Sequence, residues 1–342
     1  MMAALPPSKR YPFSFVQSCK QERNASCKDY KSCEGRIVPE LASAKEGGGA
    51  TPRWNVAGYL AVLTAAVCWG TSGIFVKLIV VGSGISALAL AFWRDLLTSA
   101  ILWTSLTLLR PAWLRVQKKD LLWLMGLGGV GVGTFHVFWN LAVIINGVAI
   151  ATVQQAAMPV IVAIVAWLLW REALTVYKIL AILLTFAGTM LISGLDAWGG
   201  VRLSPMGLLL GLGVPITYAS YSLFGKKIAG RYHPLTILTY GFSFGALALL
   251  PLQLLTSQPW PVPVAALPWF VGLLGIATIL PFSLYTFGLE RLPASVAGIL
   301  VMSEILFATV FAYIFLGERL SPLQILGAAL VVGGVLILYK SR

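Results

Sequence analysis

Long apolar runs recur through most of this chain and restrict its fold more than any other feature. Each run is long enough to cross a bilayer as an α-helix, which needs about 20 predominantly apolar residues. The runs are continuous and do not alternate between apolar and polar residues, so they predict helices and not the strands of a membrane barrel. We expect an all-α membrane protein with ten transmembrane helices, near residues 56–77, 86–109, 121–143, 148–170, 176–193, 205–225, 235–255, 267–288, 294–316 and 322–339.

The placement of the basic residues predicts how these helices are oriented. Only 11% of the residues are charged, against roughly 25% in a soluble domain, and the net charge is +13. A charge of this size could indicate nucleic acid, but Lys and Arg gather at alternate ends of the predicted spans. With the N-terminus in the cytoplasm, only Arg202 and Arg319 fall in the outer loops. This positive-inside pattern predicts a multi-pass protein of the cell membrane with both termini cytoplasmic, partnered by the lipid bilayer and not by nucleic acid.

The first 54 residues have a different composition from the rest of the chain. They are rich in polar residues and Gly, and they contain no apolar segment of the kind found in a signal peptide. We expect residues 1–54 to be a disordered cytoplasmic tail. Cys19, Cys27 and Cys33 lie in it without a neighbouring His or a Cys-x-x-Cys pair, so reduced thiols are expected and a metal site is not.

The chain also contains an internal repeat. A shift of 146 positions aligns identical residues of the two halves without a gap from 121 to 192: Trp123 with Trp269, Glu172 with Glu318 and Gly188 with Gly334, among others. This alignment predicts two five-helix repeats, at residues 55–193 and 205–340. Because five is an odd number, the second repeat must insert upside down. Inverted repeats place a substrate site near the membrane midplane between them and allow alternating access by rocking of the two halves.

Several short motifs within the repeats are characteristic. They are Trp69-Gly70, Phe92-Trp93-Arg94 and the two half-endings Trp170-Arg171-Glu172-Ala173-Leu174-Thr175 and Leu316-Gly317-Glu318-Arg319-Leu320-Ser321, each followed by a span that ends in Gly188 or Gly333-Gly334. In these motifs the chain resembles the EamA family of the drug/metabolite transporter superfamily over roughly residues 55–340. It departs from the family pattern at Trp170-Arg171, where Leu-Gly is favoured, and at Ile305, where Pro often follows the glutamate.

The resemblance implies a secondary transporter for small metabolites, such as amino acids or related amphipathic compounds, and frequently an exporter. Broad-specificity efflux of drugs or organic cations is the main alternative substrate class. We expect no cofactor, because the sequence has no Gly-x-x-x-x-Gly-Lys-Ser/Thr pattern for ATP-driven pumping. An ion channel is disfavoured by the lack of an acidic or basic ring.

Few polar residues lie inside the predicted spans, and such residues usually face the bundle interior or a wet cavity. Glu304 lies near the middle of the ninth span. Because burial favours its neutral form, it is a candidate for proton coupling or for binding an amine. The structural alternative is a protonated side chain that is hydrogen-bonded to a neighbouring helix.

The third span carries small and polar residues at intervals of three and four. Gly126, Gly129, Gly133, His136 and Asn140 would therefore share one helix face, on which small residues allow close helix approach. We expect His136 and Asn140 to line a substrate cavity where this seam opens, although a lone His is also common as a satisfied core residue.

Candidate helix breaks lie at Pro159, Pro215 and Pro281, in the fourth, sixth and eighth spans. A proline removes one backbone hydrogen bond of a helix, and transporter cavities commonly form at such breaks. Gln155 shares a face with Pro159 and is therefore a candidate for substrate binding.

Aromatic and basic residues complete the candidate site. Trp69 aligns with Tyr218 in the other half and Trp139 with Tyr285, and such rings suit apolar groups or a cation. Interfacial belts and bundle packing are the alternative roles for these rings. Arg94 could bind a carboxylate, or it could snorkel or pair with an acid.

The sequence also contains one feature that suggests an enzyme. Ser72 lies in a Gly-x-Ser-Gly pattern, and His136 is the only histidine within a predicted span. A nucleophilic site would require these two side chains within hydrogen-bond reach. The pattern is short and the internal repeat has no role in it, so we expect no enzyme.

Overall fold

α-Helices account for nearly all of the chain that the computed structural model describes, which is residues 55–146, 148–193, 205–256, 264–316 and 321–338. Residues from Asn55 onward form one unit. The predicted tail at 1–54 with Cys19, Cys27 and Cys33 lies outside the described residues, as does Glu318 of the second half-ending. Within the described ranges, pairing between extended segments is limited to a single bridge between Ala229 and Tyr232.

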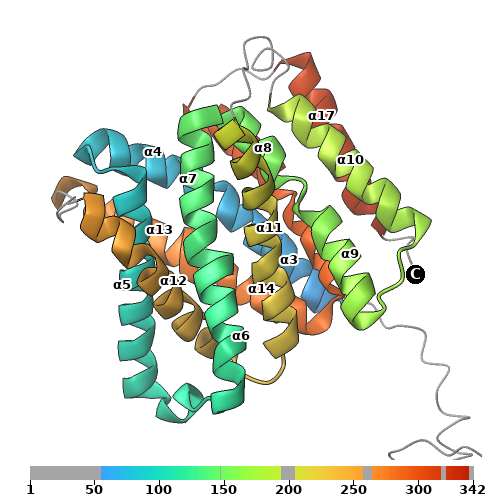
Figure 1. The fold of residues 1–342 in the computed structure, drawn as a ribbon. Helices are drawn as coiled ribbons and strands as arrows, with labels where there is room; N and C mark the ends of the chain where they lie inside the picture. The colour runs from blue at the N-terminus through green and yellow to red at the C-terminus, as the bar shows by residue number, and fades with distance from the viewer. Residues whose placement is uncertain (1–54, 147, 194–204, 257–263, 317–320, 339–342) are drawn as a thin grey trace, which may run out of the picture. The chain divides into compact units, whose positions relative to one another are not determined.

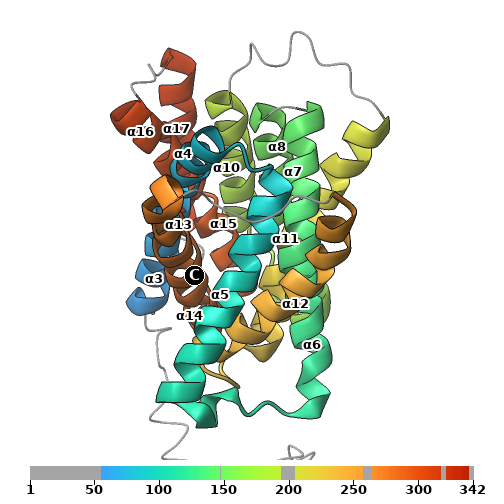
Figure 2. The same ribbon diagram turned by 90° about the vertical axis from the view of Figure 1, so that its left-hand side faces the viewer.

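The helices follow the predicted spans closely but divide several of them (Figures 1 and 2). In chain order they are α3 (Val56–Gly70), α4 (Ser72–Ser83), α5 (Ala87–Leu109), α6 (Leu121–Met125), α7 (Phe135–Asn146), α8 (Val148–Gln155), α9 (Met158–Trp170), α10 (Val176–Ile192), α11 (Pro205–Ile228), α12 (Pro234–Thr256), α13 (Leu267–Leu274), α14 (Leu280–Arg291), α15 (Ala294–Val301), α16 (Glu304–Leu316) and α17 (Pro322–Ile337). The π-helical segments η4 (Gly126–Thr134) and η7 (Gly275–Ile279) join α6 to α7 and α13 to α14.

Within the described residues, seven helical stretches are long and apolar enough to cross a membrane. They are Val56–Val80, Lys118–Ala142, Ala151–Trp170, Pro205–Ile228, Pro234–Leu255, Val264–Arg291 and Ala294–Phe315. Two shorter apolar helices correspond to α10 and α17, and α5 is 23 residues long with Arg94 and Asp95 inside it. The prediction of a helical, membrane-embedded protein is therefore confirmed.

Polar residues at the helix starts explain where several helices begin. The side chain of Asn55 accepts a hydrogen bond from the Gly58 amide at the start of α3, and Ser86 accepts one from Ala89 at the start of α5. At the start of α17, Ser321 and Gln324 form a reciprocal capping box. These side chains satisfy backbone amides that have no partner in the first turn of a helix.

The internal repeat is also visible in where the helices are interrupted. α8 ends at Gln155 and α9 begins at Met158, while α15 ends at Val301 and α16 begins at Glu304, 146 positions later in both cases. The predicted spans 148–170 and 294–316 are thus each interrupted at the same point of the repeat. The π-helical turn η7 likewise falls within the region that aligns with η4.

The three candidate proline breaks differ in outcome. Pro159 lies in the first turn of α9, directly after the interruption, and Pro281 lies in the first turn of α14, directly after η7. Pro215 interrupts nothing, because α11 continues through it. In the turn before it, Gly211 lies against the side chain of Gln154 and Gly213 lies against Phe138.

The last helices of the two halves, α10 and α17, lie side by side (Figure 1). They approach closely at two glycines. A Cβ atom built on Gly188 would lie 2.6 Å from the Gly327 carbonyl oxygen, and a Cβ atom built on Gly327 would lie 2.6 Å from the Gly188 carbonyl oxygen. Only glycine fits such a backbone approach, which is typical of helix packing inside membranes. This contact accounts for Gly188, the glycine near the end of the span that follows the first half-ending.

Candidate functional site

The two interrupted spans carry a hydrogen bond between the halves of the chain. Gln155, the last residue of α8, donates through Nε2 to Glu304 Oε1, at the first residue of α16. The Tyr218 hydroxyl of α11 also hydrogen-bonds the Glu304 carboxyl group. Gln155 and Tyr218 are both buried, with 7% of each residue exposed. Three predicted site residues, far apart in sequence, therefore meet at the interruptions.

Aromatic side chains from both halves pack beside this group. The ring of Trp69 in α3 lies 4.9 Å from that of Phe282 and 5.5 Å from that of Tyr285, both edge to face. The Tyr285 hydroxyl is 2.7 Å from Ser222 Oγ of α11. Trp69 and Tyr285 were predicted site residues, whereas Phe282 was not, because a Phe in an apolar span carries no signal that distinguishes a site from packing.

A second aromatic stack continues from Tyr218 to α7. The ring of Phe135 lies 4.8 Å from that of Tyr218, nearly parallel to it, and 6.4 Å from that of Trp139. Trp139 and the next predicted residue, Asn140, are half-buried on α7. Phe135 therefore connects the Glu304 group to the helix that carries His136, a role that the sequence did not reveal.

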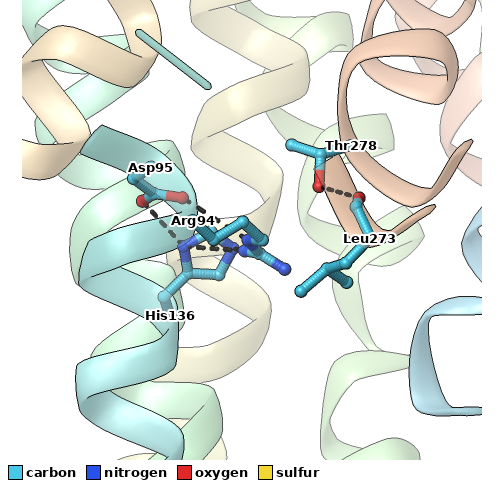
Figure 3. A network of polar contacts seen from close by, with 5 residues as sticks. All are labelled: Arg94, Asp95, His136, Leu273 and Thr278. Carbon is cyan, nitrogen blue, oxygen red and sulfur yellow. Dashed lines mark hydrogen bonds and ion pairs between the residues drawn. The ribbon is translucent and has the colours of Figure 1, made fainter. Parts of the chain in front are cut away.

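Arg94, Asp95 and His136 form a separate cluster of charged and titratable side chains (Figure 3). His136 Nδ1 is 3.0 Å from Asp95 Oδ2, and Arg94 Nε is 3.5 Å from Asp95 Oδ1. Arg94 Nη2 also contacts the imidazole ring of His136. The exposed fractions of the three side chains are 13% for Arg94, 0% for Asp95 and 7% for His136. Arg94 thus pairs with an acid, which was one of the roles predicted for it.

This cluster also bears on the hypothesis of an intramembrane enzyme. Among the described residues, the ring nitrogens of His136 contact Arg94 and Asp95, and Ser72 begins the separate helix α4. The Ser72–His136 hydrogen bond that a nucleophilic site requires is not part of this arrangement.

The prediction that the glycines of the third span form one face with His136 is wrong. Gly126 lies against the ring of Phe224 in α11, Gly133 lies against the Gly245 carbonyl in α12, and the position of Gly129 faces open space. The cause is the π-helical segment η4, whose wider turn breaks the spacing of three and four on which the prediction depended.

Two acidic residues connect loops of the first half to loops of the second. The Glu172 carboxylate accepts hydrogen bonds from the Ala294 amide at 2.8 Å and from Ser295 Oγ at 2.5 Å, at the start of α15. Its other neighbour is Lys178, with Nζ 3.8 Å away. Negative charge is favourable at the first turn of a helix. The sequence identified Glu172 as part of a motif but gave it no role.

The second connection lies between the α5–α6 and α11–α12 loops. Arg231 Nη1 lies 2.9 Å from Asp120 Oδ1, and the Tyr232 hydroxyl donates to Asp120 Oδ2 at 2.7 Å. Burial is the largest influence on the Tyr232 phenol and raises its pKa, and its bond to Asp120 acts in the same direction. Both connections lie in loops at the end of the spans where Lys and Arg gather.

Comparison with known proteins places these features in a family. The model of the EamA-like transporter family matches residues 56–194 and 205–340. The uncharacterized inner membrane transporter YicL of Salmonella typhimurium is 30% identical over 285 residues, which are 82% of this chain and 94% of that protein. The threonine/homoserine exporter RhtA of Escherichia coli is 29% identical over 283 residues, 82% of this chain and 90% of that protein. The uncharacterized transporter YwfM of Bacillus subtilis is 28% identical, with 82% and 92% covered.

A solved crystal structure has the same fold. It superposes with a TM-score of 0.71 at 20% sequence identity and covers 83% of this chain and 97% of its own. The likeness in sequence and in fold extends over both halves of the chain.

Proposed function

Because the chain belongs to the EamA-like transporter family of the drug/metabolite transporter superfamily, we propose that it is a secondary transporter that moves small metabolites by alternating access. The observation that carries this proposal is the bond between Gln155 and Glu304, which joins the interrupted spans of opposite halves. Binding sites of inverted-repeat transporters lie where discontinuous helices meet. When one half rocks against the other, a bond between the halves must change.

We propose that the substrates are amino acids or related amphipathic compounds and that net movement is export. The acid at Glu304 suits an ammonium group, and the rings around it suit an apolar side group. One relative is named as a threonine/homoserine exporter. The substrate-binding residues in this proposal are Trp69, His136, Trp139, Asn140, Gln155, Tyr218, Tyr285 and Glu304, with Glu304 also the candidate for proton coupling.

The proposed topology has ten spanning helices. Three helices, α5, α10 and α17, would complete the set begun by the seven long apolar stretches. The repeats would occupy residues 55–193 and 205–340, with both termini in the cytoplasm of a cell-membrane protein. The concentration of Lys and Arg at one end of the spans supports this orientation.

Broad-specificity efflux of organic cations is the second candidate. It is favoured by the aromatic rings of Trp69, Tyr218 and Tyr285 around a single acid, because a delocalised cation can be held against ring faces without a matched carboxylate partner.

Flux from proteoliposomes tests both candidates. Liposomes are loaded with a panel of amino acids, sugars and organic cations, and efflux is followed by mass spectrometry with and without a pH gradient. Selective efflux of amino acids supports the first candidate, and efflux of several unrelated lipophilic cations supports the second. If correctly folded protein releases none of these compounds, the transport proposal fails.

A further inference from the structure

We propose that Arg94, Asp95 and His136 form a proton-gated anion site, in which protonation of His136 frees the Arg94 guanidinium to bind a carboxylate. The site rests on the proposed function only in that the carboxylate would belong to a transported compound. It differs from the Glu304 group in its position, on α5 and α7, and in its charge.

The contacts assign the protons of the imidazole ring. Asp95 is an acceptor, so Nδ1 of His136 carries the hydrogen that points to Asp95 Oδ2 at 3.0 Å. Arg94 is always a donor, so the other ring nitrogen, Nε2, accepts from Arg94 Nη2. This neutral form of His136 satisfies both neighbours, and the cluster of one cation and one anion has no net charge.

A proton on Nε2 changes this balance. The ring then has no acceptor for Arg94, and the cluster holds two cations against one anion. Unbalanced charge inside a membrane protein is strongly unfavourable. An anion bound to Arg94 restores neutrality, so the site takes up a proton and an anion together. A carboxylate is the chemical class that fits, because the planar guanidinium can bind it with two parallel hydrogen bonds.

Arg94 is the member of the cluster that can move. Its side chain is 13% exposed, whereas that of Asp95 is fully buried, and Asp95 Oδ2 lies against the backbone of α12 at Gly245. Figure 3 shows the guanidinium of Arg94 extending past the imidazole toward Leu273 of α13. The charge that is released would therefore face away from Asp95.

The cluster also has unused hydrogen-bonding capacity. Among the described residues, Thr98 Oγ1 is buried without a hydrogen-bond partner, and Arg94 Nε and Asp95 Oδ1 have no partner beyond their 3.5 Å ion pair with each other. Thr98 lies one turn after Arg94 on α5. A purely structural ion pair in a low-dielectric interior is normally fully hydrogen-bonded. The open positions fit a cluster that exchanges partners during its working cycle.

Other titratable groups near the cluster are few. α12 contributes Tyr240, whose hydroxyl donates to the Leu114 carbonyl at 2.8 Å. Beyond Phe135, Tyr218 is bonded to Glu304. Within the described parts of the helices that pack against α5, which include α7, α12 and α13, His136 is the one imidazole, so it is the side chain of this cluster that can take up and release a proton.

Binding of trifluoroacetate tests the proposal, because this carboxylate stays ionised over the whole pH range used. Purified full-length protein in lipid nanodiscs is titrated at pH 5.5 and pH 8.0 at constant ionic strength, and binding is followed by 19F NMR. We expect binding about tenfold tighter at pH 5.5, within the roughly 5- to 150-fold range typical of coupling between two sites. A pH-indicator dye should record net uptake of protons when the anion binds, since the coupling is reciprocal.

Three variants identify the residues. R94Q should lose binding at both pH values, and H136Q should bind with the same affinity at both. The matched control is H233Q, because the chain has two histidines and His233 is the other one. His233 lies in the α11–α12 loop, where its ring stacks on that of Trp113. The H233Q variant should keep the wild-type difference.

Equal affinity at the two pH values in wild-type protein overturns the proposal, as does an unchanged pH dependence in H136Q. The wild-type comparison needs no variant to fold. Because the assay follows binding and not flux, its result is independent of the proteoliposome experiment. Pronounced pH-dependent binding without flux would contradict only the transport proposal, and flux with pH-independent binding only the anion site.

Discussion

The two halves of this protein have helices interrupted at equivalent positions, but they differ in the side chains that they carry there. Met158 begins α9 and is fully buried, whereas its repeat partner Glu304 begins α16 and bonds to Gln155 and Tyr218. His136 contacts Arg94 and Asp95, whereas its repeat partner Phe282 packs on Trp69 and Phe242. In each of these two pairs, one half has a titratable group where the other has an apolar side chain.

The opposite holds where α10 packs on α17. Gly188 and Gly334 are repeat partners, and both lie against backbone of the opposite helix: Gly188 against Gly327, and Gly334 against Ala181. Identity is retained because the two contacts impose the same steric limit. Close packing thus preserves the symmetry of the repeat at this contact, whereas polar side chains break it at Met158 and Glu304 and at His136 and Phe282.

The largest expected effect is at the position where the halves differ most. Glu304→Gln keeps the size of the side chain and its ability to hydrogen-bond with Gln155, but it can neither ionise nor bind a proton. We expect coupled flux in proteoliposomes to fall to the background of protein-free liposomes. The matched control is Met158→Leu at the equivalent position of the first half, where a swap of similar volume should cost less than about 1.5 kcal/mol and leave flux intact. Transport by the Gln variant against a gradient at the wild-type rate would contradict a coupling role for Glu304.

A smaller effect is expected where the symmetry is steric. In Gly334→Ala the new Cβ would lie 2.8 Å from Thr185 Cγ2 and 2.9 Å from the Ala181 carbonyl oxygen. Such overpacking should lower the free energy of unfolding by about 1–3 kcal/mol. The neighbouring Gly333 has open space at this position, so Gly333→Ala should be neutral or stabilising by up to about 1 kcal/mol. Thermal unfolding of the two variants in detergent measures the difference, and equal midpoints would show that α10 and α17 are not packed this closely.

Much of the fold could be predicted from the sequence because its signals are local. Apolar length locates the spans, the repeat gives the two halves, and the half-endings gave the family, which the comparison confirmed. The count of ten helices and the orientation of the termini stay predictions. The interruption of span 148–170 lies directly before Pro159, a predicted break. The interruption of span 294–316 was not predicted, because Met302-Ser303 contains neither Gly nor Pro. Pro215, which does carry the usual signal, interrupts nothing.

Local sequence signals predict less of the candidate site than of the fold. Polar groups inside apolar spans can be recognised in the sequence, as at Gln155, Tyr218 and Glu304. The structure brings these three side chains together. The sequence could not predict that Phe135 would stack on Tyr218 or that Phe282 would pack on Trp69. Contacts between the halves depend on how the spans cross. The asymmetry of His136 and Phe282 could in principle have been read from the alignment of the halves, where one of two equivalent positions is titratable.

The smallest expected effect is at the loop connection made by Glu172. In Glu172→Gln one side-chain oxygen remains to accept hydrogen bonds, but the charge-assisted bonds to Ala294 and Ser295 at the start of α15 are weakened. We expect the free energy of unfolding to fall by about 1–2 kcal/mol, because charge at a helix start and bonds to a charged group each contribute on this scale. The control is Glu290→Gln, whose side chain is 38% exposed and pairs with Arg291; loss of an exposed pair should change stability by less than about 1 kcal/mol. A loss no larger for Glu172 than for Glu290 would mean that the connection made by Glu172 adds no more to stability than an exposed ion pair does.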